Sequence, residues 1–196
     1  MRTLFTGGEI FDGTGADATV ADIVIDDGRI IEVGQGLDAD ESVDLSGYGV
    51  LPGMFDCHTH VTVSQFDYMA LLQRPFSDQG FQAAGNLRRT LDSGSTASRD
   101  AHGADLGVKQ AVADGLIPGP RMQISVTAIS QTGGHGDGWM PSGNCLELMP
   151  SHPGRPTGIA DGVDEVRRKV RELVRAGADV IKVFTSGGVL SPRDDP

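Results

Sequence analysis

The 196-residue sequence predicts an α/β fold with a parallel sheet, preceded by a small β unit. From about residue 51 onward, short apolar runs rich in strand-forming residues alternate with longer amphipathic stretches, the pattern of strand–helix repeats. The apolar runs are too continuous for strands with one face in water, and parallel strands are the kind that helices cover on both faces. We therefore place a β unit at residues 1–50 and an α/β domain at residues 51–196.

The first fifty residues consist of short strands joined by turns. The segment ADIVIDDGRIIEVGQG contains two β-rich runs, residues 23–25 and 29–33, joined through Asp27 and Gly28. An Asp-Gly pair between two such runs is a strong signal for a tight β-hairpin. This segment is therefore predicted to form a hairpin within the N-terminal unit.

Four strands and three helices are expected in alternation after the β unit. Each helix is predicted from its amphipathic spacing together with a glycine at its end or a proline just beyond it. The expected elements are the strands 50–63, 95–101, 121–130 and 178–188 and the helices 81–94, 103–117 and 161–177.

The last of these helices has the clearest apolar face. Its apolar residues recur at helical spacing, and Gly177 follows as a C-terminal cap. The residues expected on the buried face are Val163, Val166, Val170, Leu173 and Val174.

Composition excludes several classes of partner and compartment. The formal net charge of −11 disfavours nucleic acids and anionic membranes, which bind through lysine- and arginine-rich surfaces. Cys57 and Cys145 have neither zinc-finger nor disulfide-framework spacing, so a reduced cytoplasmic location is expected, with Cys57 as a small core residue. The sequence contains neither a signal peptide nor about 20 consecutive apolar residues that could span a membrane.

The stretch MFDCHTHVTV places His58 and His60 one residue apart in an apolar run. Residues at i and i+2 of a strand project from the same face, with side chains roughly 7 Å apart, so both rings can converge on one ion. Imidazole suits zinc and similar metals, and Asp56 and Thr62 share the face. The alternative is a pair of hydrogen-bonded core histidines, but the spacing favours metal ligands.

Lys182 lies in an apolar strand pattern, ADVIKVFTSGG. Val180 and Phe184 share its face while Ile181 and Val183 occupy the other, so the strand and its ammonium are expected to be buried. Burial lowers the pKa of a lysine, and the neutral amine can form a Schiff base or add CO2 to give an anionic carbamate that bridges two metals. The alternative is a buried stem whose charged end reaches solvent.

Two further histidines are candidates for contact with a substrate. His135 lies between glycines in QTGGHGDGW, within a Gly/Pro-rich loop at about 131–160, and loops of that length are usually functional. His102 follows the strand 95–101 at the sheet edge where strand ends meet loops, although a structural role for His102 or Asp100 is an equal alternative. His152 is interpreted as an ordinary surface residue.

These segments together resemble the metal-dependent amidohydrolase superfamily. LPGMFDCHTHVTV resembles its first barrel strand, with the pattern Pro-Gly-x-x-Asp-x-His-x-His, and ADVIKVFTSGGVLS resembles its fourth. TAISQTGGHGD is similar to the imidazolonepropionase-like and prolidase-like subgroup, and the first fifty residues resemble the β-sandwich portion that precedes the barrel. The resemblance implies a TIM-type (β/α)8 barrel, represented by about its first four β/α units.

The resemblance also implies a site and an activity. His58 and His60 would bind the more buried of two divalent metal ions, with zinc the expected metal, and a CO2-derived carbamate on Lys182 would bridge to the second. His135 would contact the substrate, for example its carboxylate, with His102 lining the same mouth. The implied reaction is hydrolysis of the amide C–N bond of Xaa-Pro dipeptides or N-acyl amino acids by a metal-activated hydroxide.

Alternatives and partners follow from the same resemblance. A cyclic-amide hydrolase or a deaminase of the superfamily is the first alternative, and an inactive N-terminal half that needs the remainder is the second. In the family, two further metal histidines and a catalytic aspartate come from later strands, which this sequence does not contain. An unclosed parallel sheet leaves an apolar edge, so a homo-oligomer or association with a C-terminal half is expected.

Overall fold

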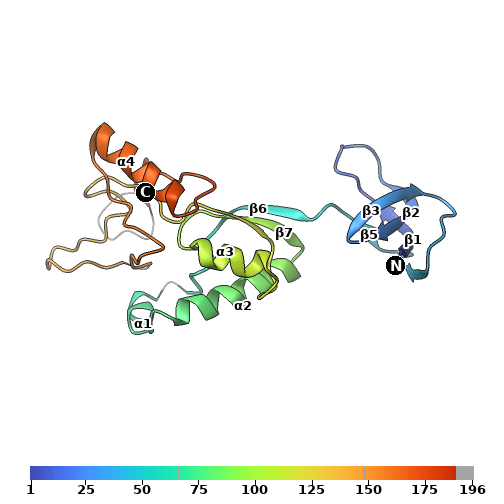
Figure 1. The fold of residues 1–196 in the computed structure, drawn as a ribbon, viewed down its shortest axis with the longest axis horizontal. Helices are drawn as coiled ribbons and strands as arrows, with labels where there is room; N and C mark the ends of the chain where they lie inside the picture. The colour runs from blue at the N-terminus through green and yellow to red at the C-terminus, as the bar shows by residue number, and fades with distance from the viewer. Residues whose placement is uncertain (66, 148, 189–196) are drawn as a thin grey trace. The chain divides into compact units, whose positions relative to one another are not determined.

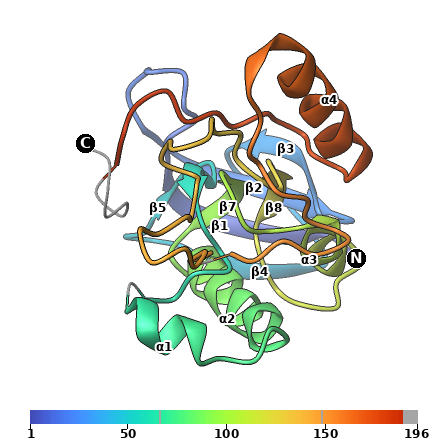
Figure 2. The ribbon, with the colours of Figure 1, turned by 90° about the vertical axis from the view of Figure 1, so that its left-hand side faces the viewer.

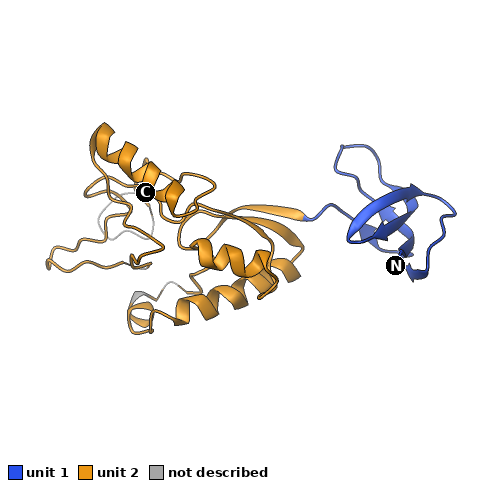
Figure 3. Cartoon of the chain, in the orientation of Figure 1, with its two compact units in different colours: residues 1–53 blue, residues 54–196 orange. Residues whose placement is uncertain are grey.

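The computed structural model describes residues 1–65, 67–147 and 149–188. The chain divides into two compact units, Met1–Gly53 and Met54–Pro196 (Figure 3). The division falls between residues 53 and 54, where the sequence predicted it between 50 and 51. The last eight residues of the predicted second domain, 189–196, lie outside the described residues.

Unit 1, residues 1–53, is a five-stranded sheet with the order β3-β2-β1-β4, to which β5 adds by pairing with β1. The predicted hairpin is confirmed: β2 and β3 pair antiparallel, and Asp27 and Gly28 between them have φ values of 47° and 70°. Positive φ at both central residues is what the tightest hairpin turn requires. The described residues of unit 1 form one sheet, so the β-sandwich remains a prediction. The strands are β1 (Thr3–Ile10), β2 (Thr19–Asp26), β3 (Arg29–Gly34), β4 (Glu41–Asp44) and β5 (Gly49–Val50).

A half-buried carboxylate organises the turns of unit 1. Asp22 on β2 accepts hydrogen bonds from the backbone N–H groups of Gly7, Gly36 and Leu37, at 3.1, 2.9 and 3.4 Å. One side chain thereby joins the bulge in β1 to the turn after β3.

Unit 2, residues 54–196, is an α/β arrangement with a three-stranded sheet in the order β6-β7-β8. Both strand pairs are parallel, as the sequence predicts for this domain. The helix α2 packs on β7 and α3 packs on β8, and the two helices lie side by side (Figure 1). In both views α1 and α4 lie on opposite sides of the unit (Figures 1 and 2). The elements are β6 (Met54–Thr59), α1 (Tyr68–Leu72), α2 (Asp78–Asp92), β7 (Ser95–Asp100), α3 (Leu106–Ala113), β8 (Arg121–Ile124) and α4 (Gly162–Arg175).

Two of the expected strands are shorter than predicted. The apolar run 50–63 is divided: β5 belongs to unit 1, and β6 ends at Thr59, so His60 lies just beyond the strand. The run 121–130 ends as a strand at Ile124, because Val126 adopts a φ of 64° that a β ladder cannot contain. Within the described residues, the chain after β8 pairs again through isolated bridges at Ile129 and Ser130.

The prediction of a fourth strand at 178–188 is wrong. The segment 178–184 forms a single parallel bridge, between Ile129 and Val183. Backbone bonds flank that bridge: Ile129 N–H donates to the Lys182 carbonyl at 2.8 Å, and Phe184 N–H donates to the Ile129 carbonyl at 2.9 Å. The segment therefore runs parallel to the chain after β8 without a continuous ladder.

The carboxylate of Asp179 holds the start of this segment. Oδ2 of Asp179 accepts the backbone N–H of Ile124 at 2.8 Å, and Oδ1 pairs with Lys109 of α3 at 2.5 Å. The backbone N–H of Asp179 also donates to the Ile124 carbonyl, at 2.8 Å. The side chain thus supplies contacts that a regular strand would obtain from its backbone.

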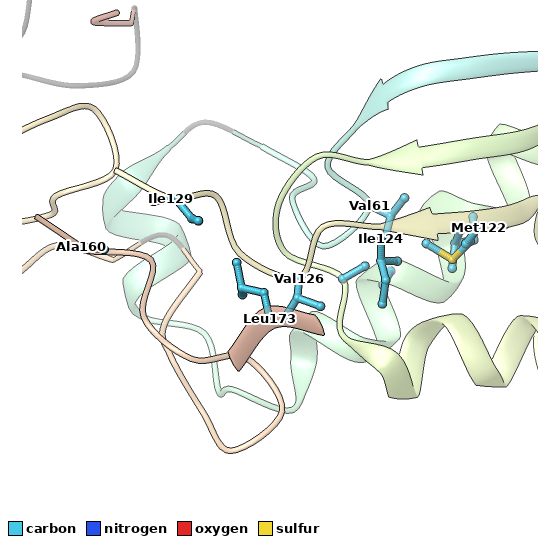
Figure 4. Close-up of a cluster of buried hydrophobic side chains, with 10 residues drawn as sticks. Val61, Met122, Ile124, Val126, Ile129, Ala160 and Leu173 are labelled. Atoms are coloured by element: carbon cyan, nitrogen blue, oxygen red, sulfur yellow. The ribbon is translucent and has the colours of Figure 1, made fainter. Parts of the chain in front are cut away.

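One apolar cluster forms the core of unit 2 (Figure 4). Leu173 of α4 is fully buried, and Val166 and Val170 pack partly buried beside it, as predicted. Val163 and Val174 were predicted on the same face, but they are 73% and 59% exposed. Val174 is turned by about 100° from Leu173 around the helix, which removes it from the contact face. The buried residues are Val61, Ala83, Leu87, Ala104, Met122, Ile124, Val126, Ile129, Ala160 and Leu173.

The long loop at 131–160 is tied at its base. Ser130 pairs with Ile159 through a parallel bridge, and the backbone N–H and hydroxyl of Thr132 both donate to the carboxylate of Asp161.

No helix in the part of the chain that the structure describes is long and apolar enough to cross a bilayer.

Candidate metal centre

His58 and His60 lie together where β6 ends. Their ring centroids are 5.2 Å apart with an interplanar angle of 64°, and Asp56 accepts the backbone N–H of His58 at 3.1 Å. Although the run that contains them is apolar, His58 is exposed and His60 is half-buried. β6 pairs only with β7 among the described strands, and α2 and α3 pack over β7 and β8, which leaves β6 open.

The ring of His60 has a defined orientation. Its Nδ1 lies 2.9 Å from the backbone carbonyl of His102, and because a carbonyl can only accept, Nδ1 carries the proton. In the neutral form of this tautomer the lone pair lies on Nε2, the atom left to bind a cation. Such a hydrogen bond on the second nitrogen is the usual support of a metal-binding histidine.

His102 is engaged on both its backbone and its ring. Besides the carbonyl bond to His60, its Nδ1 accepts the N–H of Ala128 at 2.8 Å. Burial, followed by the charges of His60 and Arg155, lowers the pKa of His102 to about 3, so the ring is neutral. These contacts give His102 a supporting role, and its contact with substrate stays a prediction.

Asp100, the last residue of β7, is fully buried. Its Oδ2 accepts the N–H of Val61 at 2.8 Å, and its Oδ1 accepts the N–H groups of His102 and Ala104 at 3.2 and 3.0 Å. Burial raises the pKa of this carboxyl, against the lowering effect of the backbone N–H groups and of His60. Asp100 therefore joins the loop after β6 to the loop after β7.

Lys182 lies close enough to His58 to affect the protonation of its ring. Burial, and then the charges of Lys182 and His60, lower the pKa of His58. The prediction of a fully buried amine is wrong, because Lys182 is half-buried and its neighbours Ile181 and Val183 are 39% and 47% exposed. Among the described residues, the segment pairs with the chain after β8 through one bridge.

His135 reaches the same segment from the long loop. Its ring centroid lies 4.8 Å from that of Phe184 in an edge-to-face arrangement, and the ring packs so closely on Gly188 that a Cβ there would overlap it. The Nζ of Lys182 lies 5.6 Å from the centroid of the same phenylalanine ring. Phe184 therefore places the predicted substrate histidine and the predicted metal-binding lysine around one side chain.

Arg155 is a buried residue that the sequence did not single out. Its guanidinium donates to the carbonyls of Gly103 and Pro150 and to the side chain of Gln79, which fastens the long loop to the loop after β7. Burial lowers its pKa, with Asp105 the largest opposing charge. An arginine in the Gly/Pro-rich segment HPGRP was the only sequence signal available.

Two residues lie in surroundings other than those expected. His152, interpreted as ordinary surface, packs its ring 5.1 Å from that of Phe76, and its Nε2 lies 3.6 Å from the carboxylate of Asp105. Cys57, expected in the core, is exposed because it lies on the open strand β6.

The donor set fits a metal that uses a lysine-derived ligand. Among the residues that the structure describes, no three histidine, cysteine, aspartate or glutamate side chains gather closely enough to hold an ion. His58 and His60 supply two nitrogens, and the cationic Lys182 nearby would become an anionic oxygen ligand on addition of CO2. The three predicted ligands therefore form a chemically consistent set.

Comparison with known proteins places the chain in a family. Residues 50–196 match the amidohydrolase family. The chain is 37% identical to ochratoxinase of Aspergillus niger in an alignment of 211 positions, gaps included, that covers 99% of this chain and 44% of that protein. A prolidase solved with N-methylphosphonate-L-proline superposes with a TM-score of 0.85 at 36% identity, covering all of this chain and 49% of that one. Dihydroorotase of Methanothermobacter thermautotrophicus is 31% identical over 118 residues, 58% of this chain and 27% of that protein.

The chain belongs to the amidohydrolase family, which is generally metal-dependent. The predicted resemblance to this family is confirmed by these matches, which include a solved prolidase. The chain spans about half the length of the relatives it matches.

Proposed function

We propose that His58, His60 and a carboxylated Lys182 bind two divalent metal ions, with zinc the expected metal, in a hydrolase of amide bonds. The observation that carries this proposal is the pair of imidazoles 5.2 Å apart, one with its Nδ1 proton held by a carbonyl, beside a lysine whose charge acts on the other. Support also comes from the family, whose matched members include a prolidase and an ochratoxinase.

Carboxylation of Lys182 resolves an electrostatic conflict. An ammonium beside His58 repels a cation, so the site favours metal only when the lysine loses its charge. The neutral amine adds CO2 with formation of an N–C bond, and the proton released from nitrogen passes to solvent. The product is a carbamate with one negative charge and two oxygens, which suits bridging between divalent ions.

The chain's own residues then have distinct tasks. His58 and His60 bind through nitrogen, and the His102 carbonyl keeps His60 in the tautomer that leaves Nε2 free. His135, on its loop against Phe184, contacts the carboxylate of the substrate. When bound, the metal ions polarise the amide carbonyl and lower the pKa of water.

The substrate class that we favour is N-acyl amino acids and Xaa-Pro dipeptides. The prolidase match supports it, since that protein was solved with a phosphonate derivative of L-proline. A cyclic amide is the second candidate, supported by the dihydroorotase match over 58% of the chain.

We extend the proposal to the architecture of the whole protein, a complete (β/α)8 barrel with an N-terminal β-sandwich. We also propose that the protein is cytoplasmic and that it forms a homo-oligomer or associates with a C-terminal half.

The proposal is tested with the purified protein, loaded with zinc in bicarbonate buffer. It should hydrolyse Xaa-Pro dipeptides or N-acyl amino acids faster than dihydroorotate, and the His58→Ala/His60→Ala variant should lose both zinc and activity. The matched control is His152→Ala, which removes a histidine of unit 2 that contacts Asp105 and should keep the zinc. Folded, zinc-treated protein that hydrolyses neither linear nor cyclic amides would contradict the proposal.

A further inference from the structure

Asp100 is the one fully buried carboxylate among the described residues, and it accepts the backbone N–H of Val61, the residue after His60. All of its hydrogen bonds come from backbone N–H groups, at 2.8 Å from Val61, 3.2 Å from His102 and 3.0 Å from Ala104. The donors belong to two separate loops, since Val61 follows β6 and the other two follow β7.

These contacts flank the hydrogen bond that orients His60. Val61 is the next residue after His60, and His102 is the residue whose carbonyl accepts the Nδ1 proton of His60. Each oxygen of Asp100 therefore fixes the backbone on one side of that bond. A shift of either loop would lengthen the hydrogen bond between His60 and His102, because Asp100 holds the backbone next to both residues.

We propose that Asp100 is a positioning residue for His60: its carboxylate joins the loop after β6 to the loop after β7, and this junction keeps His60 in the tautomer that presents Nε2 to a metal. The inference rests on the proposed function. It adds to that proposal a residue that touches neither metal nor substrate and acts through the His60–His102 bond.

The side chain chemistry makes the inference testable with a small change. Asparagine has the shape of aspartate but only one acceptor oxygen, so Asp100→Asn can satisfy the donors of one loop and turns an amide N–H toward the other. The link between the loops is then broken while the volume is kept.

Asp22 offers a matched control. It also accepts three backbone N–H groups, from Gly7, Gly36 and Leu37, but it does so in unit 1. Asp22→Asn therefore removes the same kind of contact without altering the support of His60.

The experiment measures two properties of the purified protein. Zinc affinity is measured by competition with a chromophoric chelator, and the tautomer of His60 in the metal-free protein is measured by long-range 1H–15N correlation. Asp100→Asn should weaken zinc binding by about 10- to 100-fold, the usual effect of losing a supporting partner of a ligand. It should also convert His60 from the Nδ1-protonated form to a mixture, whereas Asp22→Asn should change neither.

The inference is overturned if folded Asp100→Asn keeps both the zinc affinity and the His60 tautomer of the unaltered protein. A protein that binds no zinc would contradict the proposed function instead, and the tautomer measurement would still decide the role of Asp100. If Asp100→Asn does not fold, hydrogen exchange in the unaltered protein decides: zinc should slow the amides of Val61, His102 and Ala104 together. Slowing at Val61 alone would overturn the inference.

Discussion

The two chain segments that carry the candidate ligands are held in different ways. His58 lies on β6, which forms a parallel ladder with β7, and His60 follows directly after the strand. The segment 178–184, with Lys182, has one bridge to Ile129 and depends on a side chain, Asp179, for its alignment with β8.

The difference shows which contacts determine each ligand's position. On β6 the ladder with β7 pairs Asp56 and Thr59, on either side of His58, and the buried Asp100 holds the backbone next to His60 beyond the strand. On the segment 178–184 the ion pair of Asp179 with Lys109 makes the position of Lys182 depend on α3 as well as on the sheet. A change in α3 should therefore move Lys182 more than it moves the histidine pair.

The largest effect is expected from removing the lysine itself. Lys182→Met should lower amide hydrolysis by at least about 100-fold, because loss of a ligand should exceed the usual loss of a ligand's supporting partner. Protein prepared with 13C-bicarbonate should show a carbamate signal that is absent from this variant. The control is Lys169→Met on α4, which removes a lysine that pairs with Glu172 and should keep both the signal and the activity. The prediction is contradicted if Lys182→Met keeps them as well.

A smaller effect is expected from the clamp on the lysine segment. Asp179→Asn should lower the free energy of unfolding by about 1–2 kcal/mol, since a half-buried charged hydrogen bond is lost. The carbamate signal of Lys182 should weaken while zinc binding by the histidine pair persists. Asp92→Asn, which breaks an exposed pair with Arg88, should cost under about 0.5 kcal/mol. Equal losses in urea unfolding of the two variants would remove the distinction between the segments.

A third effect concerns the acid stability of the loop around His102. The pKa of His102 is about 3 in the folded protein against an ordinary value of 6.5, so only the unfolded chain binds a proton between these values. The stability that this histidine contributes is complete above pH 6.5 and is lost as pH falls toward 3, by at most about 1.4 kcal/mol per pH unit.

His102→Asn removes this titration and keeps an oxygen that can accept the Ala128 N–H. Urea unfolding of the variant between pH 6 and pH 4 should therefore show a shallower loss of stability than the unaltered protein. Identical slopes for the two proteins would contradict the buried, neutral state of His102.

Local sequence patterns predicted the elements whose structure depends on interactions between residues close in the sequence. The Asp27-Gly28 hairpin, the helices α2, α3 and α4, and the shared face of His58 and His60 follow from turn chemistry, periodicity and strand alternation. Burial was predicted less well, because an apolar strand pattern does not say how many neighbours cover it. Lys182 and His58 are consequently more exposed than their sequence surroundings indicated.

The supporting residues could not be found from the sequence in this way. Asp100 bonds to Val61, 39 residues away, and Asp179 bonds to Ile124, 55 residues away. Arg155 likewise reaches the carbonyl of Gly103, 52 residues earlier. Such contacts depend on which loops the fold brings together, and no local pattern encodes them.

The most direct test of the account is a crystal structure of the protein grown with zinc and bicarbonate, with the metal located by its anomalous scattering. We expect zinc at about 2.0–2.1 Å from imidazole nitrogens of His58 and His60, and electron density for a carbamate extending from Lys182 toward the same metal. Zinc bound away from the histidine pair, or an unmodified Lys182 amine directed into solvent, would contradict it.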